Sequence, residues 1–169
     1  MQGIGRQDSK EGEIMTEMRR VTAIKNGTVI DHIPSGHALQ VIRMLRIDVA
    51  SSTPVSLVMN VPSDKLVRKD VLKVEDRELS QEELDRLALI APEASIAIIR
   101  NYAVAEKMMV ELADDLENIA RCSFSNCITM DDREPLPQRL IVVSKDPIEV
   151  RCYYCGKGQE MEDLIENLL

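Results

Sequence analysis

Residues 122–127 read CSFSNC and residues 152–155 read CYYC, and these two short segments hold the four cysteines of the 169-residue chain. The segments are separated by 24 residues. Zn²⁺ takes four thiolate ligands in structural sites, and a shell closed by four cysteines leaves no position for a substrate. The spacing therefore predicts one structural Zn²⁺ ion per chain, bound by Cys122, Cys127, Cys152 and Cys155.

Two disulfides or an iron centre are the other uses of four cysteines. Residues 1–20 lack the apolar core of a signal peptide, which indicates a cytoplasmic protein. In a reducing cytosol, paired cysteines more often bind metal than each other. The four residues between Cys122 and Cys127 do not point to iron, although that alternative stays open. Ligand type and spacing favour zinc.

The charge of the chain argues against nucleic acid as a partner. The net charge is −8, and residues 115–169 carry 11 acidic and 6 basic side chains. A zinc domain that binds nucleic acid needs a basic surface for the phosphates. No stretch approaches the roughly 20 apolar residues that span a membrane. We expect the zinc segment to contact protein, with neither nucleic acid nor membrane as a partner.

The composition divides the chain into three parts. Residues 1–18 are polar and aperiodic and predict a disordered extension, in which Met15 or Met18 is an alternative start. Residues 19–114 predict one domain, and residues 115–169 predict a second domain, after a charged boundary at 111–118. About 50 residues offer little core, so the second domain depends on its metal.

Residue periodicity predicts the elements of the first domain. Apolar segments predict strands at residues 20–24, 28–33, 55–61, 67–74, 94–100 and 103–110, with Asn26-Gly27 as a hairpin turn between the first two. Ser35 is the expected cap of a helix with apolar residues at 38, 41, 42 and 45. Ser80 and Glu83 form a capping box at the start of a second helix.

This order predicts an α+β fold, in which an antiparallel or mixed sheet carries two helices on one face as a ferredoxin-like sandwich. Strands at 140–143 and 149–151 predict a small zinc-ribbon-like β domain, followed by an amphipathic helix at 160–169.

No catalytic arrangement emerges from the residues. Asp31-His32 at a strand end suits either a catalytic pair or a hydrogen-bonded strand end, and the second reading is the simpler. Lys69 and Lys73 share one face of a strand, and Lys107 lies on another. These lysines suit an anion pocket beside His32, or a solvated face.

Several motifs in the right order resemble one family. Residues 25–34 (KNGTVIDHIP) resemble the signature near the start of the regulatory chain of aspartate carbamoyltransferase. Asn60-x-Pro62-Ser63, Arg68-Lys69-Asp70 and residues 87–92 (LALIAP) also match, as do the cysteine spacings. The resemblance runs from about Val21 to about Lys157. It implies a chain without activity of its own, whose first domain binds ATP, CTP or UTP and forms a regulatory homodimer. Its zinc domain would dock on the catalytic chain.

The resemblance also implies individual roles. The base would contact the backbone of Ala23 and Ile24, near Val29 and Tyr102. The ribose would contact Asp31 and Lys73. The phosphate end would lie at His32, Val104 and Lys107, with Lys69 nearby. Asn126 resembles a residue that contacts the catalytic chain.

Three positions depart from the family pattern. Ala97 replaces an Asn near the nucleotide phosphates, Phe124 replaces an Asn in the first cysteine loop, and Thr22 replaces an acidic residue of the enterobacterial form. The alternative function is a stand-alone zinc-ribbon adaptor that binds protein partners without a nucleotide response. A catalytic enzyme has the least support, because no active-site constellation is present.

Overall fold

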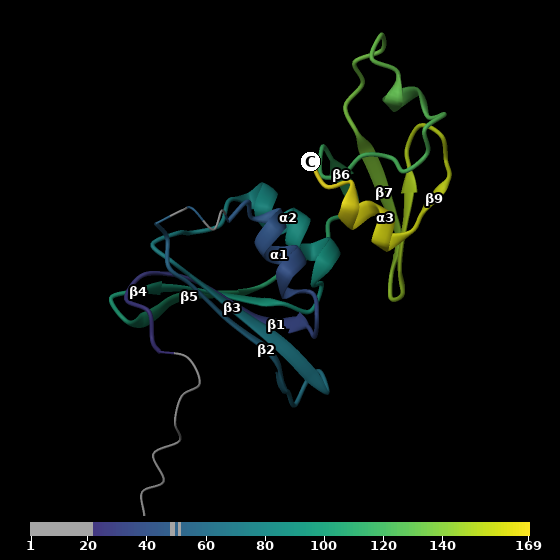
Figure 1. Cartoon of the computed structure of the whole chain (residues 1–169). Helices are drawn as coiled ribbons and strands as arrows, with labels where there is room; N and C mark the ends of the chain where they lie inside the picture. The colour runs from purple at the N-terminus through teal and green to yellow at the C-terminus, as the bar shows by residue number, and fades with distance from the viewer. Residues whose placement is uncertain (1–21, 48–49, 51) are drawn as a thin grey trace, which may run out of the picture.

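Two antiparallel sheets, each in its own half of the chain, make up the structure, a computed structural model that describes residues 22–47, 50 and 52–169 (Figure 1). The first sheet contains β1 (Gly27–Pro34), β2 (Val55–Pro62), β3 (Arg68–Glu75), β4 (Ser95–Arg100) and β5 (Ala103–Met109) in the order β2-β3-β1-β4-β5. Helices α1 (Ala38–Met44) and α2 (Gln81–Ile90) cover one face of it. Strands β1 to β4 with the two helices form the β-α-β-β-α-β arrangement of a ferredoxin-like sandwich, as the sequence predicts.

The core lies between this sheet and its helices. Ile30, Leu72 and Ile96 are cross-strand neighbours on β1, β3 and β4, and all three are buried. They pack against Val41 of α1 and Leu87 of α2 in one hydrophobic cluster. Directly paired residues of antiparallel strands point to the same face. The residues between them, such as Val29, therefore point to the face without helices.

Two bulges interrupt the sheet opposite the same part of β3. The register of β1 shifts between Ile30 and Ile33, and that of β2 shifts between Val58 and Val61. His32 and Asn60 lie inside these bulges with φ of 62° and 60°. The extra residue in β1 shifts the alternation of side chains by one position, so that Ile33 points into the core as Ile30 does.

The start of α1 differs from the expected cap. Ser35 does not cap the helix; His37 occupies the N-cap and makes no side-chain capping bond. Instead the buried carboxylate of Asp70 on β3 accepts hydrogen bonds from the N–H groups of Gly36 (2.8 Å) and Ala38 (3.2 Å). Its other oxygen accepts from the N–H of Asn60 at 2.8 Å. A distant residue thus satisfies the free amides, which local sequence cannot reveal.

The predicted hairpin at Asn26-Gly27 is wrong. Residues 22–25 form no strand, and positions 20 and 21 of the expected strand lie outside the described residues. Gly27 begins β1 with φ of 135°, and a Cβ there would lie 2.1 Å from the carbonyl oxygen of Val74. The glycine allows β1 to approach β3 closely, rather than to turn back on itself.

The second half has its own sheet. Its strands are β6 (Asp115–Glu117), β7 (Arg139–Lys145), β8 (Ile148–Cys152) and β9 (Gly158–Gln159), in chain order, with a 3₁₀ turn at Ile128–Met130. The expected strands at 140–143 and 149–151 are therefore longer, and β6 falls inside the segment predicted as a boundary. Helix α3 covers Met161–Glu166 only, because residues 167–169 turn to pair with residues 119–121.

The two halves meet through helices. α3 contacts α2, and the buried side chains of both halves belong to one continuous hydrophobic cluster (Figure 1). The capping box of α2 is present as predicted: the Ser80 hydroxyl accepts from the N–H of Glu83, and the Glu83 carboxylate accepts from the N–H of Ser80. Among the described residues, no helix is long and apolar enough to cross a membrane.

Replacing Asp70 by Asn should destabilise the fold by about 2–4 kcal/mol, because the amide cannot accept from all three backbone donors and leaves buried N–H groups unpaired. Urea unfolding followed by circular dichroism, at fixed protein concentration, measures the change. The control is Asp64→Asn, at an exposed position of the β2–β3 loop. Equal stability of the two variants would contradict the structural role of Asp70.

Candidate metal centre and ligand-binding face

The four cysteine sulfurs converge at one point of the second half. All four Sγ atoms lie within 4.8 Å of one another, and none forms a disulfide. The Sγ atoms of Cys122 and Cys155 are 3.8 Å apart, and those of Cys127 and Cys152 are 3.7 Å apart. A tetrahedron with metal–sulfur bonds of about 2.3 Å has edges of about 3.8 Å. The geometry therefore fits a single tetrahedral metal ion.

The surroundings of the sulfurs also suit a metal. Cys122, Cys127 and Cys152 are buried, and Cys155 is partly buried. In the metal-free state, burial raises the pKa of the Cys122 thiol to about 12. Burial also disfavours the Cys127 thiolate, but the hydroxyl and backbone N–H of Thr129 donate to its sulfur and lower its pKa to about 7. A bound cation would compensate the charge of four buried thiolates.

The rim of this cluster carries exposed polar and aromatic groups. Lys157 lies 4.5 Å from the ring centre of Phe124 and donates a hydrogen bond to the side-chain oxygen of Asn126 at 3.1 Å. The guanidinium of Arg139 lies 4.2 Å from the ring centre of Tyr153. Phe124 thus contributes a cation–π partner for Lys157.

The other candidate site is the face of the first sheet that the helices leave open. Lys73 on β3, Val29 on β1, Ala97 on β4 and Lys107 on β5 are cross-strand partners in one row. Residues in such a row share a face. The row therefore brings two lysines to either side of a valine and an alanine, across four strands of the open face.

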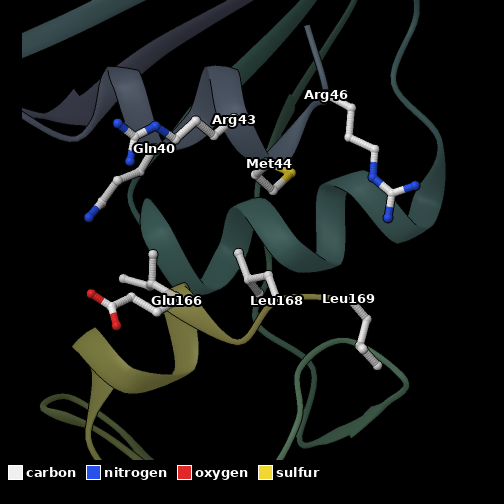
Figure 2. A pocket seen from close by; sticks show the side chains of 8 residues that line it. Gln40, Arg43, Met44, Arg46, Glu166, Leu168 and Leu169 are labelled. Carbon is white, nitrogen blue, oxygen red and sulfur yellow. The ribbon is translucent and has the colours of Figure 1, made fainter.

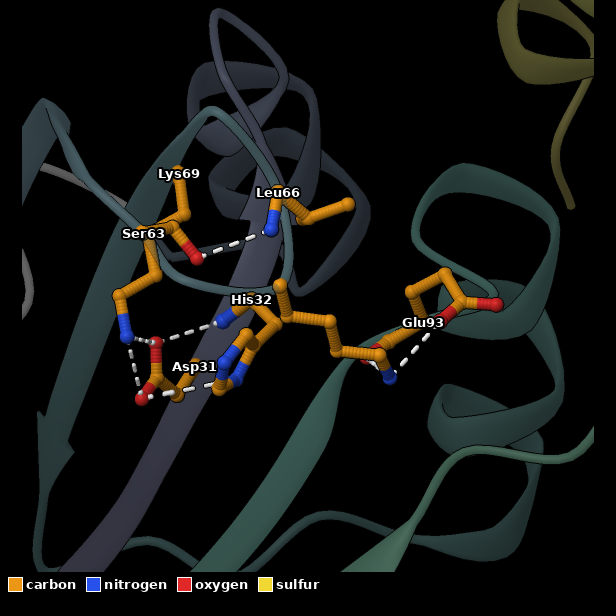
Figure 3. Close-up of polar contacts among 7 residues, drawn as sticks. Asp31, His32, Ser63, Leu66, Lys69 and Glu93 are labelled. Carbon is orange, nitrogen blue, oxygen red and sulfur yellow. Dashed lines mark hydrogen bonds and ion pairs between the residues drawn. The ribbon is translucent and has the colours of Figure 1, made fainter.

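A charged cluster lies beside this row, at the bulge of β1. The Nζ of Lys69 lies 2.8 Å from one carboxylate oxygen of Asp31 and 3.0 Å from the other. The Nδ1 of His32 lies 3.6 Å from the same carboxylate, and the backbone N–H of His32 donates to it at 2.6 Å. Figure 3 shows Lys69 and His32 on either side of Asp31. The cluster is the hydrogen-bonded strand end that the sequence favoured over a catalytic pair.

The segment before β1 closes the opposite end of the face. The Nζ of Lys73 donates to the carbonyl oxygen of Thr22 at 3.0 Å, and the N–H of Tyr102 donates to the carbonyl of Lys25 at 2.9 Å. Ala23 and Ile24 lie between these two anchors. Tyr102 is 67% exposed, and Val104 is on the open side of β5, opposite Ile99. The structure thus brings Val29, Lys73, Val104 and Lys107 to one face, with Asp31, His32 and Lys69 at one end and the segment of Ala23 and Ile24 next to the other.

Two features of the site were missed from the sequence. Asp70 follows Lys69 directly but points into the core, where it holds the bulge of β2 and the start of α1. Ser95 is the cross-strand partner of Asp31 and adds a hydroxyl beside the charged cluster. Once the register is known, strand alternation predicts the position of Ser95. The local sequence contains no pattern that predicts the role of Asp70.

Comparison with known proteins identifies the family of both halves. The family model described as "Aspartate carbamoyltransferase regulatory chain, allosteric domain" matches residues 19–111, and the metal binding domain of the same chain matches residues 114–165. The chain belongs to this family. The open sheet face lies in the part matched by the allosteric domain, and the four cysteines lie in the part matched by the metal binding domain.

Full-length relatives carry the same description. The aspartate carbamoyltransferase regulatory chain of Pyrococcus abyssi is 48% identical over 155 residues, which is 91% of this chain and 100% of the relative. That of Korarchaeum cryptofilum is 48% identical over 154 residues, covering 91% and 98%. That of Thermoplasma acidophilum is 43% identical over 150 residues, covering 89% and 99%. The similarity therefore spans both halves.

Replacing Cys152 by Ser should abolish stoichiometric metal binding and unfold the second sheet, because three thiolates no longer close the shell and the small core cannot fold alone. Elemental analysis should give about one metal ion per wild-type chain and much less for the variant. Hydrogen exchange should show lost protection in β7 and β8, with β1 and β3 unchanged. The control is Ser144→Ala on β7, away from the sulfurs; a Cys152→Ser chain with full metal content would contradict the site.

Proposed function

We propose that the chain is a non-catalytic regulatory subunit that binds nucleoside triphosphates (ATP, CTP or UTP) on the open face of its first sheet. It would act in the cytoplasm on aspartate carbamoyltransferase, the enzyme named in its family, and so on pyrimidine biosynthesis. The observation that carries the proposal is the set of lysines and a histidine gathered on a face that no helix covers. A triphosphate carries several negative charges and needs such a surface.

The basic side chains of the open face differ in how strongly they can attract the phosphates. Lys107 is exposed on an edge strand and is available to phosphate oxygens. Lys69 is already paired with Asp31, so a phosphate near it must compete with a carboxylate. A lysine is a flexible point charge that adapts to phosphate oxygens, and His32 adds charge as the pH falls. We therefore assign the larger electrostatic contribution to Lys107 and Lys73, with Lys69 and His32 secondary.

Base recognition belongs to the other end of the face. The resemblance places the base against the backbone of Ala23 and Ile24, and the structure holds this segment between Lys73 and Tyr102. Backbone donors and acceptors in a fixed segment can distinguish the edges of different bases. Asp31 and Lys73, along the same face, would contact the ribose.

For the metal we propose Zn²⁺. Four thiolates in a closed tetrahedral shell are the ligand set that structural zinc prefers, and the sulfur separations match it. We propose one domain for each of the two sheets: the allosteric domain at 19–114 and the zinc domain at 115–169. An N-terminal extension at 1–18 precedes them. The zinc domain would contact the catalytic chain near Asn126.

We also propose a regulatory homodimer joined through β5. Every residue of β5 is exposed, and Val104, Met108 and Met109 are large apolar side chains among them. An apolar edge strand with unpaired backbone groups is a template for pairing with another strand. A second copy of the same edge, related by two-fold symmetry, would satisfy it.

Lys107→Ala should weaken binding of ATP, CTP and UTP by about 1–3 kcal/mol each, because it removes a charge-assisted contact to phosphate. Calorimetric titration of the full chain measures the change, and binding should fall with added salt. Lys145→Ala is the matched control, since Lys145 lies on β7 in the zinc-domain half, where it pairs with Asp114. Unchanged affinity in Lys107→Ala would show that the phosphates bind elsewhere.

The same titration tests Ala97. Ala97 lies between Val29 and Lys107 in the open row, so Ala97→Asn adds a side-chain amide where the phosphates are expected. We expect tighter binding and sharper discrimination among the three nucleotides. No response to Ala97→Asn, with Lys107→Ala still weakened, would move the phosphates away from β4.

Charges on the β5 edge should dissociate the dimer. In Met108→Lys/Met109→Lys, a lysine stands on each face of the edge strand, and like charges from two copies repel. Sedimentation should show a dimer for wild type and a monomer for the double variant. Met59→Lys, which charges the opposite edge strand β2, is the control and should remain a dimer; a monomeric wild type would contradict the proposal.

Release of the metal should release the catalytic chain. A mercurial binds thiolates more tightly than zinc does, so it should remove the metal and dissociate a complex with aspartate carbamoyltransferase, while the regulatory chain alone shows no activity. Gel filtration with zinc analysis follows both events. If the complex survives metal loss, the contact lies elsewhere, and if no complex forms, the chain is better described as a stand-alone zinc-ribbon adaptor.

A further inference from the structure

The cavity between α1 and the C-terminal segment is open to solvent in its polar part. Figure 2 shows α1 above this cavity and α3 below it. Its charged lining residues, Arg43, Arg46 and Glu166, are exposed, so water already solvates them and they select no ligand. Reactive side chains in unequal surroundings gather elsewhere, in the cysteine cluster.

The four cysteines of the cluster differ in exposure. Cys122, Cys127 and Cys152 are 2%, 4% and 2% exposed, whereas Cys155 is only partly buried. The turn after β8 places Cys155 at the outer side: the N–H of Gly156, with φ of 70°, donates to the carbonyl oxygen of Cys152 at 2.9 Å. Oxidation of cysteine follows thiolate character and exposure. A small oxidant in solution therefore reaches Cys155 before the other three.

The sulfurs are neighbours across the two cysteine segments. The Sγ of Cys155 lies 3.8 Å from that of Cys122, and the Sγ of Cys127 lies 3.7 Å from that of Cys152. The S–S bond of a disulfide is about 2 Å long, so the first pair must close by about 2 Å. Residues 122–127 form a loop outside the strands, so a movement of this size breaks no strand pairing.

We propose that Cys155 is an oxidation site for hydroperoxides and that Cys122 then closes a disulfide with it. The Cys155 thiolate attacks one peroxide oxygen, the O–O bond breaks and hydroxide leaves, so that the sulfur becomes a sulfenic acid. The Cys122 thiolate attacks this sulfur, the S–S bond forms and a second hydroxide leaves. Two thiolates thus supply the two electrons that reduce one molecule of hydrogen peroxide.

The disulfide removes two of the four metal ligands. Cys127 and Cys152 alone do not close a tetrahedral shell, so the second sheet loses the stabilisation that a bound metal provides. This consequence rests on the proposed Zn²⁺ and on the proposed contact of the zinc domain with the catalytic chain. Peroxide would then weaken that contact, and a thiol reductant together with Zn²⁺ would restore it by exchange with the disulfide.

The test treats the full-length, metal-loaded chain with a small excess of hydrogen peroxide. Dimedone in one sample traps sulfenic acid, and peptide mass spectrometry locates the label there and the disulfides in a second sample. A chromophoric chelator follows the released metal. We expect Cys155 to carry about tenfold more label than any other cysteine, because it alone is accessible. The disulfide between Cys122 and Cys155 should form in step with metal release.

Two ligand substitutions separate attack at Cys155 from general damage to the cluster. Histidine is also a ligand of structural zinc, so Cys155→His and Cys127→His both keep four donors. Cys127→His should still form the disulfide between Cys122 and Cys155. Cys155→His should release its metal about tenfold more slowly than Cys127→His, because its accessible position no longer carries a thiolate.

Three results would overturn the proposal: label mainly on another cysteine, a Cys155 disulfide mainly with a partner other than Cys122, or equal metal release from the two histidine variants. The first two are read from the wild type, so they decide the proposal even where a variant binds no metal.

Elemental analysis before oxidation separates this proposal from that of the metal. A wild-type chain purified without metal would contradict the proposed Zn²⁺ alone. The dimedone experiment on that reduced chain would still support the oxidation site if Cys155 carries most of the label, and uniform labelling of the four cysteines would overturn it.

Discussion

The buried carboxylate of Asp70 is the constraint on which the first half of the molecule depends. It accepts three backbone hydrogen bonds, two from the start of α1 and one from the bulge of β2. A charge with no solvent exposure is tolerated because each contact is charge-assisted and few lone pairs remain unpaired. Since successive strand residues point to opposite faces, Lys69 is directed to the open side, where it meets Asp31. Two consecutive residues of β3 therefore act on opposite faces of the sheet: Asp70 on the core side and Lys69 on the charged open side.

The second half depends on a different constraint. Its four short strands enclose few apolar side chains, and four buried thiolates at one point are stable only when a cation balances their charge. The C-terminal residues then connect this half to the first, because α3 contacts α2. Coupling between an effector and a catalytic partner requires an element with two arrangements that both sites bias. The contact between α2 and α3 is where the structure joins the two halves.

Sequence reasoning succeeded where the signal is local or repeated. The cysteine spacing, the Ser80–Glu83 capping box and the alternating strands at 55–61 and 94–100 each carry their own physical cause within a few residues. It failed where the partner is distant. Ser35 has the right side chain for a cap, but Asp70, 35 positions later, satisfies the amides instead. Asn26-Gly27 has the composition of a hairpin turn, but Gly27 is needed for close approach to Val74. The grouping of the open-face residues came from family resemblance, and only the register explains it.

Two large side chains at the ends of the open face lie on left-handed backbone. Tyr102 is the second residue of the tight β4–β5 turn and has φ of 63°, and His32 sits in the β1 bulge with φ of 62°. Glycine or asparagine adopts this conformation more readily, so a tyrosine or a histidine there costs about 1 kcal/mol or more. Both side chains belong to the residues that the family resemblance assigns to nucleotide binding. Hydrogen bonds hold both conformations: the N–H of His32 donates to the Asp31 carboxylate, and the N–H of Tyr102 donates to the carbonyl oxygen of Lys25.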